Sequence, residues 1–145
     1  MQPSLFHRLK NKCPSLSLIS NNNYNHAELL NTLYTDLYLL FTTRPIYYGR
    51  IDKKVAEATI LNYGVEVVDN TKLQGDKETI GKLTAESILY AINNFEKRLR
   101  NVKVEKEKIT ADKITFKVTA LFNMKIISFV VTWEISVASY SLDLY

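Results

Sequence analysis

The chain has 145 residues, of which 46% are apolar and 23% charged, and its net charge at pH 7 is +4. These values are typical of one globular domain with a sizeable core, and no apolar run reaches the roughly 20 residues that a membrane-spanning helix needs. The single cysteine, Cys13, excludes an internal disulfide. It fits a reducing compartment, and the first residues lack the apolar core of a secretory signal peptide.

Residues 1–24 are expected to form a flexible N-terminal arm, because small and polar residues dominate and Pro3 and Pro14 interrupt the segment. Residues 25–145 are then expected to form a single domain. Its first helix is predicted from Asn25 to Thr42, with Asn25 as the N-terminal cap and Pro45 just beyond the end. Apolar residues recur there at steps of three and four: Leu29, Leu33, Leu37, Leu40 and Phe41.

A shorter helix is predicted over Lys53–Tyr63, with Gly64 at the position of a C-terminal cap. A polar connection over Val65–Gly81 follows and is expected to be the most mobile part of the domain. The last helix is predicted over Leu83–Arg100. Its apolar stripe consists of Ile88, Ile92, Phe95 and Leu99.

Three strands are predicted next, over Val102–Thr110, Lys113–Phe122 and Ile126–Val137. Apolar residues alternate along the last two, and the connections are short enough for antiparallel hairpins. Helices followed by a C-terminal antiparallel three-stranded meander make an α+β fold. The predicted core combines the apolar face of the last helix with one face of the sheet, and includes Phe95, Leu99, Phe116, Phe129 and Trp133.

The residue pattern argues against most kinds of catalytic site. His7 and His26 lie far apart with no cysteine or carboxylate cluster at ligand spacing, so neither a metal nor a cofactor is expected. The four glycines form no phosphate-binding loop. Glu96 is the one carboxylate beside an apolar stripe, and no second carboxylate is marked out as its partner in glycoside hydrolysis. The sequence therefore predicts no enzyme.

Nucleic-acid binding is also disfavoured. Lysines and arginines cluster between Lys97 and Lys113, but Glu96, Glu105, Glu107 and Asp112 alternate with them. Alternating charge along a strand indicates a solvated face or a protected sheet edge. The aromatic residues that stack on bases are not interleaved with this cluster.

The stretch "NNFEKRLRNVKV" (Asn93–Val104) leads from the last helix into the first strand. Successive helical residues advance by about 100°, which would place Glu96 and Arg98 on opposite sides of the apolar stripe. Residues two apart on a helix do not face each other. We therefore expect Glu96 and Arg98 to hold two different partners; the alternative is two ordinary charges at the boundary of the core.

Several motifs, in order, resemble the TssE family of type VI secretion baseplate proteins and the related sheath-initiator wedge proteins of contractile phage tails. They are "PSLFHRL" (Pro3–Leu9), "LYTDLYLLFTTRP" (Leu33–Pro45), "ILNYG" (Ile60–Gly64) and "EKRL" (Glu96–Leu99). The last corresponds to a glutamate–proline–arginine–leucine run in the family, with Lys97 in place of the proline. Without that proline we expect the helix to continue smoothly through Glu96.

The resemblance implies a structural, non-enzymatic role in the cytoplasm, in a baseplate docked at the inner membrane. The partners implied are other wedge subunits and the contractile sheath protein, with no nucleic acid and no membrane insertion. Glu96 and Arg98 match the family residues that fix the protein to the wedge. The small sheet would carry the first ring of sheath by accepting a strand along a free edge. The two candidate edges are Val102–Thr110 and Ile126–Val137. Alternatively, the C-terminal "ASYSLDLY" covers the sheet edge.

Two other functions stay open from the sequence. One is a phage tail wedge protein of the same fold. The other is a muramidase-type hydrolase, since the family is also labelled lysozyme-related.

Overall fold

The computed structural model describes residues 25–45, 62–68 and 76–144. The predicted arm over residues 1–24, most of the predicted helix Lys53–Tyr63 and the middle of the connection Val65–Gly81 lie outside these residues. The chain divides into two compact units, Met1–Leu39 and Leu40–Tyr145, and each is described by itself. Neither of the two described helices is long and apolar enough to cross a bilayer.

Helix α2 spans His26–Thr42, close to the predicted limits, and the chain leaves the helix before Pro45. The main-chain N–H groups of Glu28 and Leu29 donate to the carbonyl of Asn25 at 2.9 and 3.1 Å, which begins the helix. The predicted apolar stripe is the buried side of the helix, with every member at most 6% exposed: Leu29, Leu33, Leu37, Leu40 and Phe41.

Helix α4 spans Lys77–Phe95, so the predicted limits Leu83–Arg100 were wrong at both ends. It begins earlier because Asp76 caps it: the Asp76 carboxylate accepts hydrogen bonds from the Glu78 N–H, at 3.1 Å, and from the Thr79 hydroxyl. Gly81, assigned by sequence to the connection, lies inside the helix and is buried. A Cβ at Gly81 would lie 3.2 Å from Cδ of Lys106, so this glycine lets the helix pack closely against the sheet.

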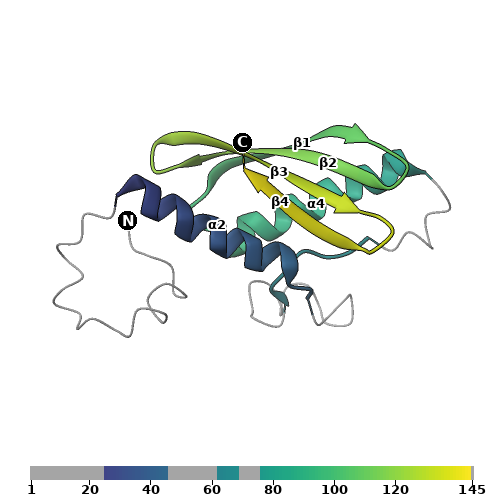
Figure 1. Ribbon diagram of the computed structural model, residues 1–145, viewed down its shortest axis with the longest axis horizontal. Helices are drawn as coiled ribbons and strands as arrows, with labels where there is room; N and C mark the ends of the chain where they lie inside the picture. The colour runs from purple at the N-terminus through teal and green to yellow at the C-terminus, as the bar shows by residue number, and fades with distance from the viewer. Residues whose placement is uncertain (1–24, 46–61, 69–75, 145) are drawn as a thin grey trace. The chain divides into compact units, whose positions relative to one another are not determined.

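The sheet is an antiparallel meander of four strands in the order β1-β2-β3-β4 (Figure 1), with limits Arg100–Ile109, Lys113–Phe122, Lys125–Glu134 and Ser139–Leu144. The α+β class is confirmed, and the prediction of three strands was wrong. The third strand ends at Glu134, and a turn in which Ala138 has φ 50° returns the chain as β4. Because of that turn, Val137 is 59% exposed instead of continuing the inner face.

One face of the sheet and the buried side of α4 form the core of the second unit, and α4 runs across the sheet in Figure 1. Phe116 and Trp133 are 0% exposed, Phe129 is 1% and Leu99 is 5%. Phe95, the last residue of α4, is half-buried and its ring lies edge-on to Tyr63 at 5.2 Å. Opposite residues such as Ile114 and Trp133, or Phe116 and Val131, keep the apolar side chains of β2 and β3 on the same face.

Truncating the largest core side chains tests this packing. We expect Phe116→Ala and Trp133→Ala each to lower the free energy of unfolding by about 3–5 kcal/mol, because each leaves a cavity that the sheet cannot close. Chemical denaturation followed by circular dichroism measures the change. Val137→Ala is the matched control and should change it by less than about 0.5 kcal/mol. Equal, small effects from all three variants would contradict the assignment of the inner face.

The cap at Asp76 makes a second, pH-dependent prediction. The Thr79 hydroxyl and the Glu78 N–H donate to the carboxylate and hold the pKa of Asp76 below its ordinary value of 3.8. A lowered folded-state pKa means that the stabilisation is fully present above pH 3.8 and is lost as pH falls through the lower folded value. We therefore expect Asp76→Ala to lower the melting temperature at pH 7, and the difference from the parent protein to shrink below pH 3.8. A difference independent of pH would show that the charge of the cap is unimportant.

Candidate functional site

Helix α4 and strand β1 are joined by a tight corner, which we define as Glu96–Leu99. The main-chain N–H of Glu96 still donates to the carbonyl of Ile92, at 2.9 Å, but Glu96 has φ −117° and ψ 78°, which is not helical. The N–H of Leu99 donates to the carbonyl of Glu96 at 3.2 Å and closes one turn. The helix therefore ends at Phe95, and the expectation of a smooth continuation through Glu96 was wrong.

Within this corner Glu96 and Arg98 bind each other. Nε of Arg98 donates to Oε1 of Glu96 at 2.7 Å and Nη2 donates to Oε2 at 2.6 Å. The main-chain N–H of Arg98 also donates to Oε1, at 3.2 Å. The expectation that the two charges would not pair was wrong, because the helical periodicity on which it rested stops one residue before Glu96.

This ion pair is largely removed from water. The Glu96 side chain is 8% exposed and the Arg98 side chain 15%. A two-pronged arginine–carboxylate contact fixes the relative orientation of both groups as well as neutralising them. The ion pair is therefore a nearly neutral, rigid feature of the corner, and Lys97 is the exposed charge beside it.

Lys97, which the sequence resemblance aligns with a proline, turns its side chain back along the helix. Its ammonium Nζ donates to the carbonyl of Asn93 at 2.8 Å. A cation at this position satisfies a carbonyl of the last turn and interacts favourably with the helix dipole. Lys97 thus stabilises the end of α4 by a different physical means from proline.

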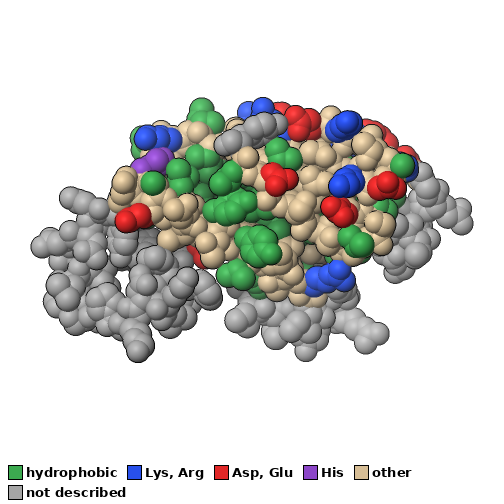
Figure 2. All heavy atoms as spheres, in the orientation of Figure 1, with side chains coloured by type: hydrophobic (Ala, Val, Ile, Leu, Met, Phe, Trp, Pro, Cys, Tyr) green, Lys and Arg blue, Asp and Glu red, His purple; other side chains and the backbone are tan. Residues whose placement is uncertain are grey.

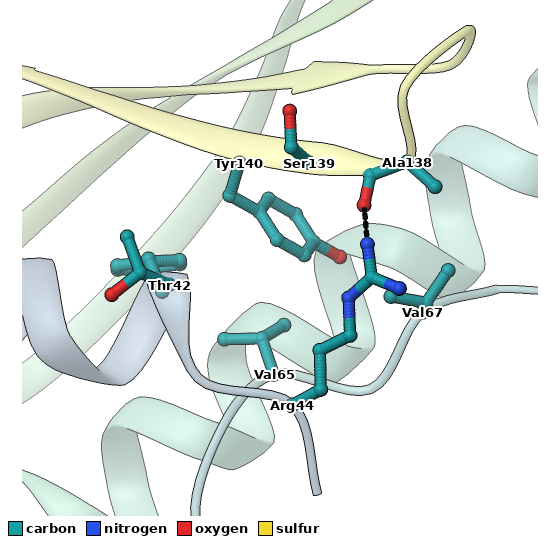
Figure 3. A pocket seen from close by; sticks show the side chains of 8 residues that line it. Thr42, Arg44, Val65, Val67, Ala138, Ser139 and Tyr140 are labelled. Atoms are coloured by element: carbon teal, nitrogen blue, oxygen red, sulfur yellow. Dashed lines mark hydrogen bonds between the residues drawn. The ribbon is translucent and has the colours of Figure 1, made fainter.

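A small pocket lies where three segments remote in sequence meet (Figure 3). The guanidinium of Arg44 donates through Nη2 to the carbonyl of Ala138 at 2.5 Å, and the hydroxyl of Tyr140 donates to the carbonyl of Glu66 at 3.3 Å. The pocket volume is roughly 130 Å³, well below that of most cofactor sites. Its lining residues are Phe41, Thr42, Arg44, Val65, Val67, Ala138, Ser139 and Tyr140.

These contacts explain how β4 is held. The ring of Tyr140 lies 4.5 Å from that of Trp133 and 5.8 Å from that of Phe41. Nearby, Gly64 has φ 126°, and a Cβ there would lie 2.3 Å from the carbonyl oxygen of Thr43, so only glycine fits. Gly64 was predicted as a helix cap, and Arg44 and Tyr140 were not predicted as site residues because no local pattern marks them.

The two outer strands of the sheet are β1 and β4. Strand Ile126–Val137 was therefore wrongly considered a free edge: most of it is β3, which β4 covers from Phe129 to Glu134. The alternative that the C-terminal segment covers that edge is confirmed. The other candidate edge, Val102–Thr110, is mostly β1. Among the described strands, β1 pairs only with β2, on one of its two sides.

Strand β1 carries irregularities as well as charge. Its register with β2 shifts between Arg100 and Lys103 and again between Lys106 and Lys108, and Asn101 has φ 51°. The ammonium of Lys106 pairs with Glu78 of α4, so it is not a free edge charge. Lysines, arginines and carboxylates are interspersed over this side of the molecule in Figure 2. Bulges and mixed charges limit indiscriminate pairing.

No group of three potential metal ligands is found among the described residues. The corner and the sheet edges are thus the candidate functional features, and both fit docking of another protein.

Comparison with known families gives one match. A family model described as "Baseplate wedge protein gp25" matches residues 27–125, which include α2 except its first residue, the corner, β1, β2 and the β2–β3 turn. Searches of curated proteins and of solved structures give no match.

Disrupting the corner tests its energetics. Removing one partner of a buried ion pair costs about 3–5 kcal/mol, and we expect Arg98→Ala and Glu96→Ala to fall near the lower end because Arg98 keeps some exposure. The double variant should lose less than the sum of the single variants, since no buried charge is left alone. Denaturation of the four proteins measures this coupling, with Lys108→Ala, at an exposed lysine of β1, as the control. Strictly additive losses would show that the pair is not coupled.

Proposed function

The chain belongs to the gp25 family of baseplate wedge proteins, and from this premise we propose that it binds the wedge and initiates sheath assembly in a type VI secretion apparatus. Family membership gives it a structural role in a contractile, phage-like baseplate. Assignment to a secretion system follows the sequence resemblance to TssE. A phage tail wedge protein of the same fold is the second candidate, and the genes adjacent to this one distinguish the two.

The observation that carries the proposal is the free side of β1. Within the described sheet, β1 has a neighbour on one side only, so a row of main-chain N–H and C=O groups faces outward over much of its ten residues. A strand from a sheath subunit can extend the sheet there through main-chain hydrogen bonds. The bulges and mixed charges of β1 favour a partner that is already positioned by the baseplate over chance pairing.

The proposed wedge contact is the corner. Glu96 and Arg98 act there as one neutral unit instead of two independent anchors, because each already holds the other. A partner would contact the short turn that the pair stabilises, including the exposed Lys97. The same pairing disfavours a hydrolase. A retaining or inverting glycosidase needs a carboxylate free to donate or accept a proton, and Glu96 is held by a guanidinium.

We further place the protein in the cytoplasm, in a baseplate docked at the inner membrane, with wedge subunits and the sheath protein as partners. Turnover of peptidoglycan by the purified protein would count against this function and in favour of the muramidase alternative.

Single proline substitutions along β1 test strand addition. Successive N–H groups of a strand point to opposite edges, so of Val104→Pro and Glu105→Pro one removes an outward N–H and the other an N–H directed at β2. We expect the outward variant to fold, to bind wedge subunits and to fail in sheath assembly, as seen by electron microscopy. The inward variant should be destabilised.

The control for this experiment is a change of side-chain charge at the same edge. Lys103→Glu keeps every N–H and should have a weaker effect that salt suppresses. Lys106 is unsuitable because it pairs with Glu78. A matching proline series in β4, at Ser141 and Leu142, tests the other outer strand. Normal sheath from every folded variant would rule out strand addition.

A further inference from the structure

The hairpin that joins β2 and β3 projects beyond both outer strands (Figure 1). Arg100 pairs with Leu121, so β1 begins opposite the end of β2, and β4 reaches β3 only as far as Phe129. The end of the hairpin, which we call the hairpin tip and define as Phe122–Ser128, extends past β1 on one side and past β4 on the other. Among the described residues, Lys125–Ser128 pair with β2 alone.

The turn at the hairpin tip contains a residue in an unfavourable conformation. Asn123 and Met124 form the two-residue turn, with φ 47° and 65°. Positive φ at both positions is the type I′ turn, in which asparagine followed by glycine is preferred. Asparagine tolerates this region, but for methionine it is sterically costly. Glycine at position 124 would relieve that cost.

The Met124 side chain offers no compensating contact within the described chain, since it is 89% exposed. Ile126, two residues later, is 76% exposed. Ile126 lies opposite Leu121, which in turn lies opposite Arg100, so these side chains form one row across the outer face of the sheet. A strained backbone and two exposed apolar side chains at one projecting point are more consistent with binding than with folding.

We propose that the hairpin tip docks into an apolar groove of a neighbouring baseplate subunit, bordered by carboxylates. Met124 and Ile126 fill the groove. Arg100, which is exposed and lies in the same row as Ile126, faces the carboxylates at its border. This contact is separate from the corner and from the β1 edge, and it rests on membership of the baseplate family but not on sheath initiation.

The observations favour a protein over a lipid surface as the occupant. The N–H and C=O groups of Lys125–Ser128 on the side away from β2 need hydrogen-bonding partners, which a protein groove provides and hydrocarbon does not. Two apolar side chains also bury too little surface to hold a protein on a membrane. Arg100 alone would fit either surface, so the edge of Lys125–Ser128, which has no partner strand beside β2 among the described residues, decides.

Met124 is the only methionine besides Met1, which provides a direct measurement. The chain is co-produced with the wedge subunits encoded beside it, and the free protein and the purified complex are treated with hydrogen peroxide. We expect the Met124 thioether to become sulfoxide rapidly in the free protein and at least about tenfold more slowly in the complex. An equal rate in the complex would overturn this proposal while leaving wedge binding intact. Absence of any complex would overturn both.

Substitutions separate binding from folding. Met124→Gly suits the positive φ, so we expect an equal or higher melting temperature together with about tenfold weaker binding to the wedge subunits. Ile126→Thr keeps a β-branched side chain and should weaken binding similarly. Val137→Thr, in the turn at the other end of β3, changes an exposed apolar residue of similar kind and should leave binding unchanged.

Two results would overturn the proposal. One is that Met124→Gly and Ile126→Thr both bind the wedge subunits with the affinity of the wild-type protein. The other is Met124-dependent flotation of the isolated protein with phosphatidylglycerol vesicles, which would identify a membrane as the occupant.

Discussion

The pairing of β2 with β3 is the constraint on which the second unit depends. Ten consecutive pairs, from Lys113 opposite Glu134 to Phe122 opposite Lys125, proceed without a register shift. Side chains alternate between faces, so a slip by one residue would move every buried group of one strand to the solvent side. The cost of exposing Phe116, Phe129 or Trp133 therefore fixes the register. Once it is fixed, the end of the hairpin, the coverage by β4 and the free side of β1 are all determined.

The corner has a related effect at the start of the sheet. The chain must pass from α4 to β1 within four residues, and a buried Glu96 in that turn would be unfavourable without a partner. Arg98 supplies the partner from the other side of the same turn. The pair therefore stabilises the change of direction that allows α4 to lie across the face of the sheet. Any wedge contact at this point acts on a feature that also supports the fold, which links binding and stability there.

Regular patterns in the sequence were enough to predict much of this architecture. The apolar stripe of α2 and the strict alternation of β2 gave these elements nearly their observed limits, because a single amphipathic element must bury one face whatever its neighbours are. The fourth strand could not be obtained in this way. Its turn has no glycine, proline or asparagine, and β4 buries only Tyr140 and Leu142. Its position depends on Trp133, which pairs with Tyr140 across the turn, and on Arg44, which is remote in sequence.

The candidate site was harder to predict for a different reason, which is local. Glu96 and Arg98 were identified as important residues, but their relation was derived from an ideal helix, and the helix stops at Phe95. The N-terminal cap at Asp76 could have been recognised from the sequence. Aspartate is a usual capping residue, and Glu78 and Thr79 follow it by two and three residues. The strain at Met124 had no such signal, because an Asn-Met turn does not resemble a type I′ hairpin in sequence.

Lys97 shows how one local geometry can be encoded in two ways. A proline at this position disfavours helical geometry in the residue before it and so ends the helix by covalent constraint. Glu96 has φ −117° and ψ 78° here without that proline. The same direction is imposed by the hydrogen bonds of Glu96 with Arg98 and by the cap that Lys97 places on Asn93. A constraint built from side chains depends on charge, whereas one built from proline does not. The direction of the chain at this corner therefore depends on the charges of Glu96, Lys97 and Arg98.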